Sequence, residues 1–382
     1  MKAWLFSMLI AMSVGPLAAS PADPQSSEPE LAWHDVANWG VEGRGWSDNF
    51  ENAYDRLPAR AKEKVEAGVW SYGRNSAGLS ADFYTDASEI HVRYRLTSTN
   101  LSAFPDVSNT PASGVDLYVA FDGIDGSGAS QLTWRWIGAN KPRTRDVNDV
   151  LAKGMTTGRR LYRLYLPLYN GVEKIEVGVP QNSSFEPVRP RRDKPIVFYG
   201  TSITQGGVAS RSGLAFPSIL GRRLNRPIVN LGFCGYGRME PELAQLVAEI
   251  DARVYVIDAL QNLPIDQVVQ RARGFVASLR RDHPRTPILL VEFGDHPTKD
   301  IFPAEAAKHA KLNAALRLVY DELTRAGDQH LHYLEGGPLL GSDGEATGDG
   351  LHPNAIGMLR YADAYEPVLR EILKQEEAVK WR

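Results

Sequence analysis

The sequence predicts an antiparallel β-sandwich followed by an α/β domain built on a parallel five-stranded sheet. The chain has 382 residues, which is comfortable for two domains. In its first half, short alternating strand patterns are separated by Gly, Asn, Asp and Pro clusters, as in a sandwich. In its second half, strand-like runs alternate with helical patterns, which is typical of a parallel sheet with helices on both faces.

Composition excludes several classes of function. With 43% hydrophobic and 23% charged residues, the sequence is that of an ordinary globular protein. A net charge of −3 gives no sign of a nucleic-acid partner or of an electrostatically held membrane surface. Cys234 is the single cysteine, so no intramolecular disulfide can form.

Residues 1–20 are predicted to be a signal peptide. Lys2 gives a positive start, residues 3–14 are apolar, and Gly15 and Pro16 break the run before the small residues 18–20. The alternative is a retained membrane anchor, but the apolar run is short for spanning a bilayer. We therefore expect an exported protein, periplasmic or secreted.

The sandwich is expected over residues 31–188. The pattern is clearest at residues 88–96, where Ile90, Val92, Tyr94 and Leu96 fall on one face. Further strands are expected at residues 115–121, 132–137, 160–166 and 172–179. One helix is expected near residues 52–67, where apolar residues recur at helical spacing.

A proline-rich, basic connector at residues 187–195 marks the boundary, and the α/β domain is expected over residues 192–378. Residues 196–199 form a continuous apolar run, which suits a strand buried on both faces. The expected strands are 196–199, 228–231, 254–257, 288–293 and 332–334. The expected helices are 214–224, 240–249, 265–282, 303–326 and 354–374.

Ser202 directly follows the first of these strands. The carboxyl ends of parallel strands are where open α/β sheets place ligands and chemistry. A serine hydroxyl needs a base before it becomes a good nucleophile, and that base is usually histidine. Ser202 is therefore the candidate nucleophile, and a histidine at the same sheet edge is required. The two glycines Gly206 and Gly207 also allow a nucleotide-binding module, but the stretch lacks a P-loop lysine and the G-x-G-x-x-G spacing.

His352 is the candidate base. It lies in D-G-L-H-P-N (residues 349–354), between the last predicted strand and the final helix, and Asp349 precedes it by three residues. A turn of that length can bring the Asp349 carboxylate to the far ring nitrogen of His352. The alternative is that the motif is only a turn and a helix start.

Two further strand ends offer donors for a developing oxyanion. Gly235 follows the second strand, where the absence of a Cβ would let a backbone N–H approach a reacting carbonyl. Asn262 follows the third strand and offers a side-chain N–H. Turn chemistry alone would also explain both residues.

Four blocks in this order resemble the SGNH (GDSL-type) hydrolases: G-T-S-I-T-Q-G (200–206), N-L-G-F-C-G (230–235), the strand-terminal Asn262 and D-G-L-H-P-N. The resemblance implies a flavodoxin-like α/β/α fold and no metal or cofactor. It also implies Ser202 as nucleophile, His352 as base and Asp349 as the third triad member. The implied oxyanion hole comprises the Ser202 and Gly235 backbone N–H groups and the Asn262 side chain.

The chain departs from the usual family pattern in two blocks. Thr201 stands where the family name implies Asp, and D-A-L-Q-N-L-P (258–264) replaces the usual G-x-N-D. Together with G-V-D-L-Y at residues 114–118, these departures resemble a subgroup in which a G-x-D-L-Y β-sandwich precedes the hydrolase.

The resemblance and the export pattern together predict an exported serine esterase acting on O-acyl, above all O-acetyl, esters of carbohydrates. One alternative is a short-chain lipase or lysophospholipase-like esterase, which would need a wide apolar groove. Another is a carbohydrate-binding protein with an inactive hydrolase domain. An acylated carbohydrate is the expected partner under the first hypothesis.

Overall fold

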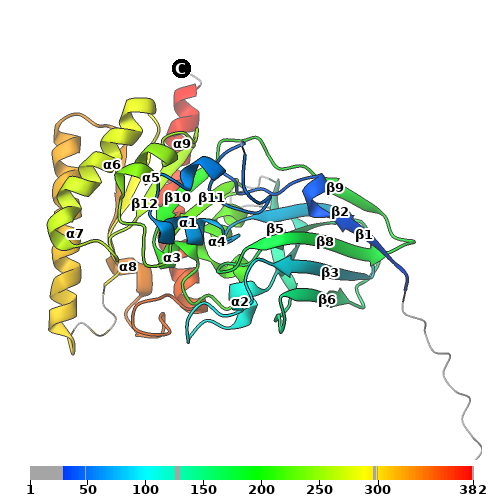
Figure 1. The fold of residues 1–382 in the computed structure, drawn as a ribbon. Helices are drawn as coiled ribbons and strands as arrows, with labels where there is room; N and C mark the ends of the chain where they lie inside the picture. The colour runs from blue at the N-terminus through cyan, green and yellow to red at the C-terminus, as the bar shows by residue number, and fades with distance from the viewer. Residues whose placement is uncertain (1–28, 48, 125–129, 296–297, 299, 381–382) are drawn as a thin grey trace, which may run out of the picture.

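The computed structural model describes residues 29–380 except for 48, 125–129, 296–297 and 299. The predicted signal peptide lies outside the described residues. Within these described ranges, no helix is both long enough and apolar enough to cross a membrane. The chain forms two lobes, an N-terminal β lobe and a C-terminal α/β lobe (Figure 1).

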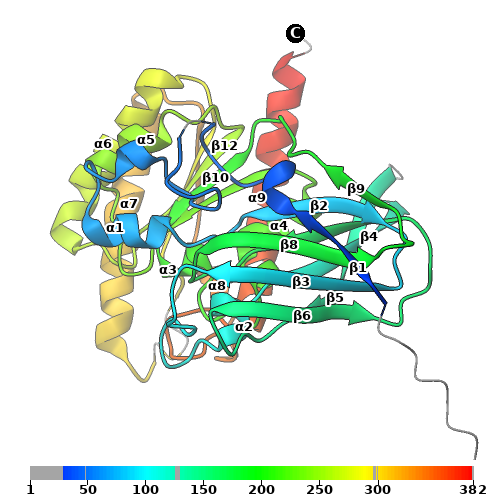
Figure 2. The same cartoon turned by 45° about the vertical axis from the view of Figure 1, so that its right-hand side comes forward.

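The N-terminal lobe contains two antiparallel sheets, which confirms the predicted sandwich. One sheet has the strand order β1 (Leu31–Asp35), β8 (Val172–Pro180), β3 (Glu89–Leu96), β6 (Asp146–Lys153). The other has the order β5 (Ser130–Ala139), β4 (Asp116–Ile124), β7 (Arg160–Tyr165), β2 (Ser80–Thr85), β9 (Phe185–Val188). Their inward side chains form one core, with Val92, Leu117 and Ile175 among its buried members. Figure 2 shows the two sheets stacked.

The region between β1 and β2 packs on both lobes, because Val36, Trp39 and Tyr54 belong to the sandwich core whereas other residues of the region lie against the α/β lobe. It contains η1 (Val36–Asn38), η2 (Ala59–Ala61) and α1 (Ala67–Gly73). Trp46, Leu57 and Trp70 from this region belong to the same buried cluster as the parallel sheet. We call residues 36–79 the strap. The helix predicted over residues 52–67 is wrong, because Pro58 lies in its middle with an extended backbone, φ −68° and ψ 151°.

The C-terminal lobe confirms the predicted parallel five-stranded sheet. Its strand order is β11 (Ile228–Gly232), β10 (Ile196–Gly200), β12 (Val254–Asp258), β13 (Ile288–Val291), β14 (Leu331–Leu334), and every neighbouring pair is parallel. This is the flavodoxin-like order. The chain passes from β10 to one side and then to the other, so β10 marks the switch point at which such sheets bind ligands.

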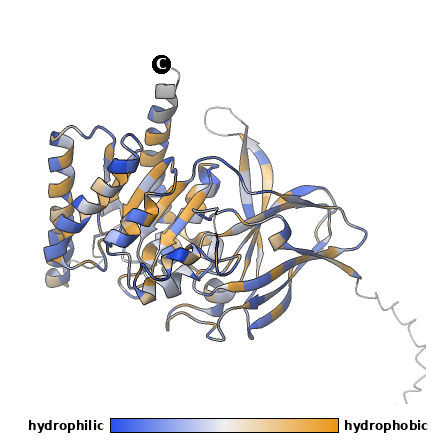
Figure 3. Cartoon of the chain, turned by 45° about the horizontal axis from the view of Figure 1, so that its top comes forward, coloured by the Kyte–Doolittle hydropathy of each residue, from blue (hydrophilic) through white to orange (hydrophobic). Residues whose placement is uncertain are grey.

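Helices cover both faces of this sheet. Successive side chains of β10 point to opposite faces, so this strand contributes to the hydrophobic core on each face. Val197 and Tyr199 pack with α5, α6 and α7, whereas Ile196 and Phe198 pack with α4 and α9. The hydrophobic strands stand out at the centre of this lobe (Figure 3). The helical segments are α2 (Asn109–Ser113) in the β lobe, then α3 (Ser202–Gln205), η3 (Ser212–Leu214), α4 (Phe216–Arg223), α5 (Pro241–Val247), η4 (Ile265–Gln267), α6 (Val268–Asp282), α7 (Pro303–Arg325), α8 (Gly337–Leu340) and α9 (Ala355–Lys380).

Candidate active site

Ser202 is the first residue of α3, immediately beyond the end of β10. Thr201 caps this short helix, because its hydroxyl accepts a hydrogen bond from the Ile203 N–H at 3.3 Å. Ser202 is buried, with only 6% of its surface exposed, at the well-packed edge of the sheet. The β-strand and the cap together fix the position of this side chain.

Ser202, His352 and Asp349 form a continuous hydrogen-bonded chain. The Ser202 Oγ lies 2.8 Å from His352 Nε2, and His352 Nδ1 lies 2.6 Å from Asp349 Oδ2. The serine and the histidine are separated by 150 residues of sequence, and the fold brings them together. The geometry matches that of a nucleophile, a base and a residue that orients the base.

A tight turn holds Asp349 against the imidazole. Gly350 has φ +85°, a conformation that favours glycine, and Asp349 Oδ1 accepts the N–H groups of Leu351 and His352 at 3.0 and 2.7 Å. Burial alone would raise the pKa of Asp349, but these bonds and the one from the His352 ring bring that pKa below its ordinary value. An ionised Asp349 can therefore stabilise an imidazolium at His352.

The D-G-L-H-P-N motif also starts a helix, as the alternative interpretation predicted. Asn354 accepts hydrogen bonds from the N–H groups of Ile356 and Gly357 at 2.9 and 3.1 Å, at the start of α9. Capping by Asn354 and the placement of His352 thus occur in the same six-residue motif. The helix start anchors the turn that carries the histidine.

Gly235 lies in the loop after β11, which packs against the end of β10 through the Phe233 N–H and the Gly200 carbonyl at 3.0 Å. Its φ is +74°, and an added Cβ would meet no protein atom within 4 Å. Within the protein, glycine is therefore favoured by backbone conformation rather than by crowding. The sequence suggested a different reason for glycine here, namely the close approach of a substrate. The described protein atoms around Gly235 do not require that explanation.

Asn262 reaches the same loop from the end of β12. Its Nδ2 donates to the Tyr236 carbonyl at 2.8 Å, so it contacts the residue next to Gly235 and not Ser202 itself. An amide nitrogen carries two hydrogens, and this bond uses one of them. The second N–H is the one that an oxyanion would require.

The two departures from the family pattern are joined in the structure, a link that sequence reasoning missed. The Thr201 hydroxyl donates to Gln261 Oε1 at 3.2 Å, and Gln261 Nε2 donates to the buried Asp258 at 2.7 Å. Tyr365 of α9 donates to the other oxygen of Asp258 at 2.8 Å. Burial raises the pKa of Asp258 to about 6, although both hydrogen bonds favour the ionised form. The ends of β10 and β12 are thereby tied to α9.

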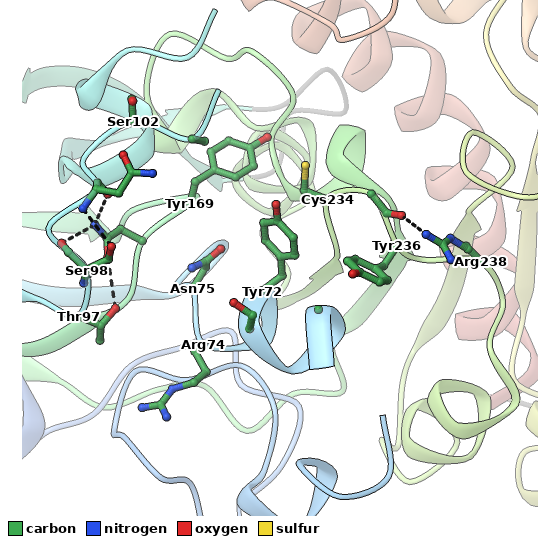
Figure 4. A pocket seen from close by; sticks show the side chains of 16 residues that line it. Tyr72, Arg74, Asn75, Thr97, Ser98, Ser102, Tyr169, Cys234, Tyr236 and Arg238 are labelled. Carbon is green, nitrogen blue, oxygen red and sulfur yellow. Dashed lines mark hydrogen bonds between the residues drawn. The ribbon is translucent and has the colours of Figure 1, made fainter. Parts of the chain in front are cut away.

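A cleft of about 700 Å³ is lined by residues of both lobes (Figure 4), and one of these residues, Cys234, hydrogen-bonds to the Ser202 hydroxyl. The α/β lobe lines it with Cys234, Gly235, Tyr236 and Arg238. The β lobe and the strap supply the other wall, which is rich in hydroxyl and amide groups: Ser71, Tyr72, Arg74, Asn75, Thr97, Ser98, Asn100, Ser102, Tyr169 and Asn170. The wall chemistry is polar with a few aromatic rings, and nothing in the sequence patterns identified these residues.

The β lobe also contacts the candidate triad. The Phe104 ring lies 5.5 Å from the His352 ring and 5.4 Å from the Tyr169 ring, measured between centroids. The Tyr169 hydroxyl donates to the carbonyls of Gly207 and Ser202 at 2.7 and 3.3 Å. Residues of the N-terminal lobe therefore border the edge of the sheet that carries Ser202.

Arg56 of the strap stabilises β11, the strand that leads into the Gly235 loop. Its buried guanidinium donates to the Asn230 and Gly232 carbonyls at 2.9 and 2.8 Å, and to the Tyr72 carbonyl at 2.6 Å. These bonds join the strap to the strand that precedes Gly235. A single arginine in an irregular segment gave no sequence signal for this role.

Cys234 is half-buried. Its burial raises the pKa of the thiol, and hydrogen bonds with the hydroxyls of Tyr72 and Ser202 only partly offset that rise. The thiol is therefore neutral at the edge of the cleft and contributes shape to it.

Comparison with known proteins matches both lobes to described families. Residues 31–185 match the GxDLY model, the N-terminus of SGNH-hydrolase-type esterases, and residues 193–370 match the GDSL-like lipase/acylhydrolase family. Among proteins with curated descriptions, none matches this chain.

Solved structures share the two-lobe arrangement. A protein from Bacteroides ovatus, described as a GDSL-like lipase, has 28% identity and a TM-score of 0.83, over 90% of this chain and 98% of its own. The salicylyl-acyltransferase SsfX3 of a tetracycline biosynthetic pathway has 21% identity and a TM-score of 0.64, over 93% and 96%. A family two carbohydrate esterase from Cellvibrio japonicus has 12% identity and a TM-score of 0.58, over 90% and 98%.

The last two likenesses are below the identity at which more than the fold can be compared. The family matches, the parallel sheet and the four motif blocks agree with one another. The chain is a member of the SGNH (GDSL-type) esterase family, with a GxDLY N-terminal domain before its hydrolase domain.

Proposed function

We propose that this protein is an exported serine esterase that removes short acyl groups, above all O-acetyl groups, from carbohydrates. The observation that carries the proposal is the hydrogen-bonded chain from Ser202 Oγ through His352 to Asp349, at 2.8 and 2.6 Å. Export is proposed from the N-terminal sequence pattern alone.

In the proposed mechanism, His352 Nε2 takes the proton of Ser202 as Oγ attacks the ester carbonyl. The oxyanion that forms receives hydrogen bonds from the Ser202 and Gly235 backbone N–H groups and from the free N–H of Asn262. As the tetrahedral intermediate collapses and the ester C–O bond breaks, His352 gives its proton to the leaving sugar oxygen, which departs as a hydroxyl. Water attacks the acyl-enzyme by the same route, which releases the acid and restores Ser202.

Asp349 holds the imidazole so that Nε2 faces the serine. Its carboxylate accepts the Nδ1 proton, which fixes the tautomer and stabilises the imidazolium that follows proton transfer. The lowered pKa of Asp349 keeps it in the charged form that this role needs.

The chemistry of the cleft supports a sugar ester over a lipid. The wall facing Gly235 presents Ser98, Asn100 and Asn75, whose side chains can hydrogen-bond to ring hydroxyls. Tyr72 and Tyr236, with ring centroids 6.2 Å apart, supply flat apolar surfaces between these polar groups. A long acyl chain would be placed against unmatched polar groups here, at a cost.

The family description and the Bacteroides ovatus protein give a lipase-like esterase as the second candidate. The two candidates are separated by hydrolysis of p-nitrophenyl acetate, p-nitrophenyl octanoate and an O-acetylated xylo-oligosaccharide. The proposal predicts that acetyl esters are preferred and that octanoate is a poor substrate. A strong preference for octanoate would contradict the acetyl-esterase proposal, and no hydrolysis of any ester would contradict the enzyme itself.

A further inference from the structure

A second groove lies between the two lobes, apart from the catalytic cleft. It has a volume of about 400 Å³ and is bounded by β5 of the sandwich and by α4 and the segment before it. None of the residues that line the catalytic cleft lines this groove. It is therefore a separate feature of the interface between the lobes.

The groove holds a buried guanidinium that forms no ion pair with any described residue. Arg222 is 9% exposed and stacks over the Tyr118 ring, with 4.1 Å between its Cζ and the ring centroid. Among the residues described, Arg222 has no carboxylate within ion-pair distance, and its buried Nη1 has no hydrogen-bond acceptor. Stacking on an aromatic ring attracts the charge but leaves the N–H group unsatisfied.

Two neighbouring groups are in a similar state. The Tyr118 hydroxyl and Arg211 Nε are buried, and neither has a hydrogen-bond partner among the described residues. Arg211 lies 3.5 Å from Asp116, which already accepts hydrogen bonds from Trp136 and Gly213 at 2.6 and 2.8 Å. Among the described residues, Asp116 therefore pairs with Arg211 through its Nε and not with Arg222, so the positive charge of Arg222 is not balanced by an ion pair.

Flat apolar surface lies beside this charge. Trp134 and Trp136 are two residues apart on β5, so both point to the face that borders the groove. Trp136 is 47% exposed even though Arg211 lies over its ring at 4.9 Å. An exposed indole next to unsatisfied donors is an unusual combination for a surface that serves only to join two domains.

We propose that this groove binds a sugar ring that carries a carboxylate, such as a uronic acid unit of an acidic polysaccharide. The planar guanidinium of Arg222 suits a carboxylate, because its fork can donate two parallel hydrogen bonds. The Tyr118 hydroxyl offers a partner for a ring hydroxyl, and the exposed indole of Trp136 covers the apolar face of the ring. The proposal does not depend on hydrolysis at Ser202.

Isothermal titration calorimetry on the Ser202→Ala protein tests this site without turnover. The probes are trigalacturonate, its uncharged counterpart galactotriose, and citrate as an anion without a sugar ring. We expect trigalacturonate to bind at least about tenfold more tightly than either control, because only it offers both the carboxylate and the ring. No measurable binding of trigalacturonate, or equal binding of galactotriose or citrate, would overturn the proposal.

Substitutions then locate the binding. Arg222→Gln should weaken trigalacturonate binding by at least about tenfold, and Arg222→Lys by less, because it keeps the charge but loses the fork. The matched control is Arg238→Gln in the catalytic cleft, which should change binding less than about twofold if the two sites are separate. Loss of binding in Arg238→Gln but not in Arg222→Gln would assign the ligand to the catalytic cleft and overturn the proposal.

Arg222→Gln could destabilise the interface between the lobes, so thermal unfolding of each variant is measured alongside. If Arg222→Gln does not fold, Trp136→Ala takes its place, because this side chain is half exposed and Arg222 stacks on Tyr118 instead. The change also removes the indole hydrogen bond to Asp116 and the ring beneath Arg211, so its thermal unfolding is compared with that of the wild type. Binding by Trp136→Ala at wild-type strength would contradict the proposed site. An approximately tenfold loss would support it.

Discussion

The two walls of the catalytic cleft are built in different ways. On the α/β side the cleft is lined by residues 234–238, in the loop after β11. The proposed triad and oxyanion donors lie next to this loop, at the ends of parallel strands and in the turn before α9. The other wall comes from the strap and from sandwich loops, and it carries Tyr72 and several small polar groups. Phe104 belongs to the same lobe, and its ring contacts the His352 ring. Parallel strands bring distant residues to one edge, whereas loops can change without disturbing that edge.

We therefore expect the rate of ester hydrolysis and the selectivity for sugar esters to depend on different walls of the cleft. We expect substitutions on the α/β wall to lower the rate for every ester. Substitutions on the other wall should act on sugar esters and spare small synthetic ones.

Among substitutions that keep the nucleophile, Asp349→Asn should lower the rate of hydrolysis most. We expect kcat for p-nitrophenyl acetate to fall by about 10³- to 10⁴-fold with little change in KM, because the imidazole loses its orientation and its counter-charge. Steady-state kinetics at neutral pH provide the measurement. Asp343→Asn is the matched control, since Asp343 lies in the same loop but pairs with Arg360 at 2.6 Å. Equal rates for the two variants would remove Asp349 from the proposed triad.

Asn262→Ala tests the proposed side-chain donor to the oxyanion. We expect kcat to fall by about 10²-fold for acetyl esters with or without a sugar, since the lost hydrogen bond forms only in the transition state. Rates on both ester types should be compared with those of Gln245→Ala, an exposed amide on α5. A change confined to KM would instead show that Asn262 holds the substrate.

Phe104→Ala tests the contact between the N-terminal lobe and the proposed triad. Loss of a ring that borders His352 should lower kcat/KM for an O-acetylated oligosaccharide by about three- to tenfold, and for p-nitrophenyl acetate by less than half of that factor. Phe121→Ala, on the partly exposed end of β4, is the control for a phenylalanine away from the cleft. An equal loss of kcat/KM on both substrates would contradict the expectation that the N-terminal lobe acts mainly on sugar esters.

Asp258→Asn tests the network behind the site through stability. Burial raises the pKa of Asp258 from the ordinary aspartate value of 3.8 to about 6, so the folded protein holds this proton more tightly than the unfolded chain does. The wild type therefore loses stability at this residue as pH rises from 4 to 6, and the loss persists above that range. We expect the Tm of Asp258→Asn relative to wild type to increase across this interval, with at most about 3 kcal/mol involved. A pH-independent Tm difference would show that Asp258 is ionised in the folded protein at all these pH values.

The sequence predicted the α/β lobe well because its signals are local. The apolar run 196–199 and the helical periodicity after it determine a buried strand and its covering helices, and strand ends then indicate Ser202 and Asn262. The turn from Asp349 to His352 spans four residues, so its geometry was also within reach. For Gly235 the position was predicted, but the structure gives conformation as the protein's own reason for glycine.

The rest was out of reach because it depends on contacts between distant segments. Arg56 donates to Asn230, 174 residues further on, and no periodic pattern marks the strap in which it lies. Phe104 and Tyr72 acquire a role only once the two lobes meet. The failed helix over residues 52–67 has the same origin, since tertiary contacts and Pro58 override its apparent periodicity.

Formation of a covalent intermediate on Ser202 is the step on which the proposed function depends. Acid-quenched mass spectrometry after mixing with p-nitrophenyl acetate detects this intermediate, and peptide mapping locates the added group. We predict one acetyl group on the peptide that contains Ser202, longer-lived in Asp349→Asn and absent from Ser202→Ala. Acetylation at another residue, or turnover by Ser202→Ala at the wild-type rate, would contradict this mechanism.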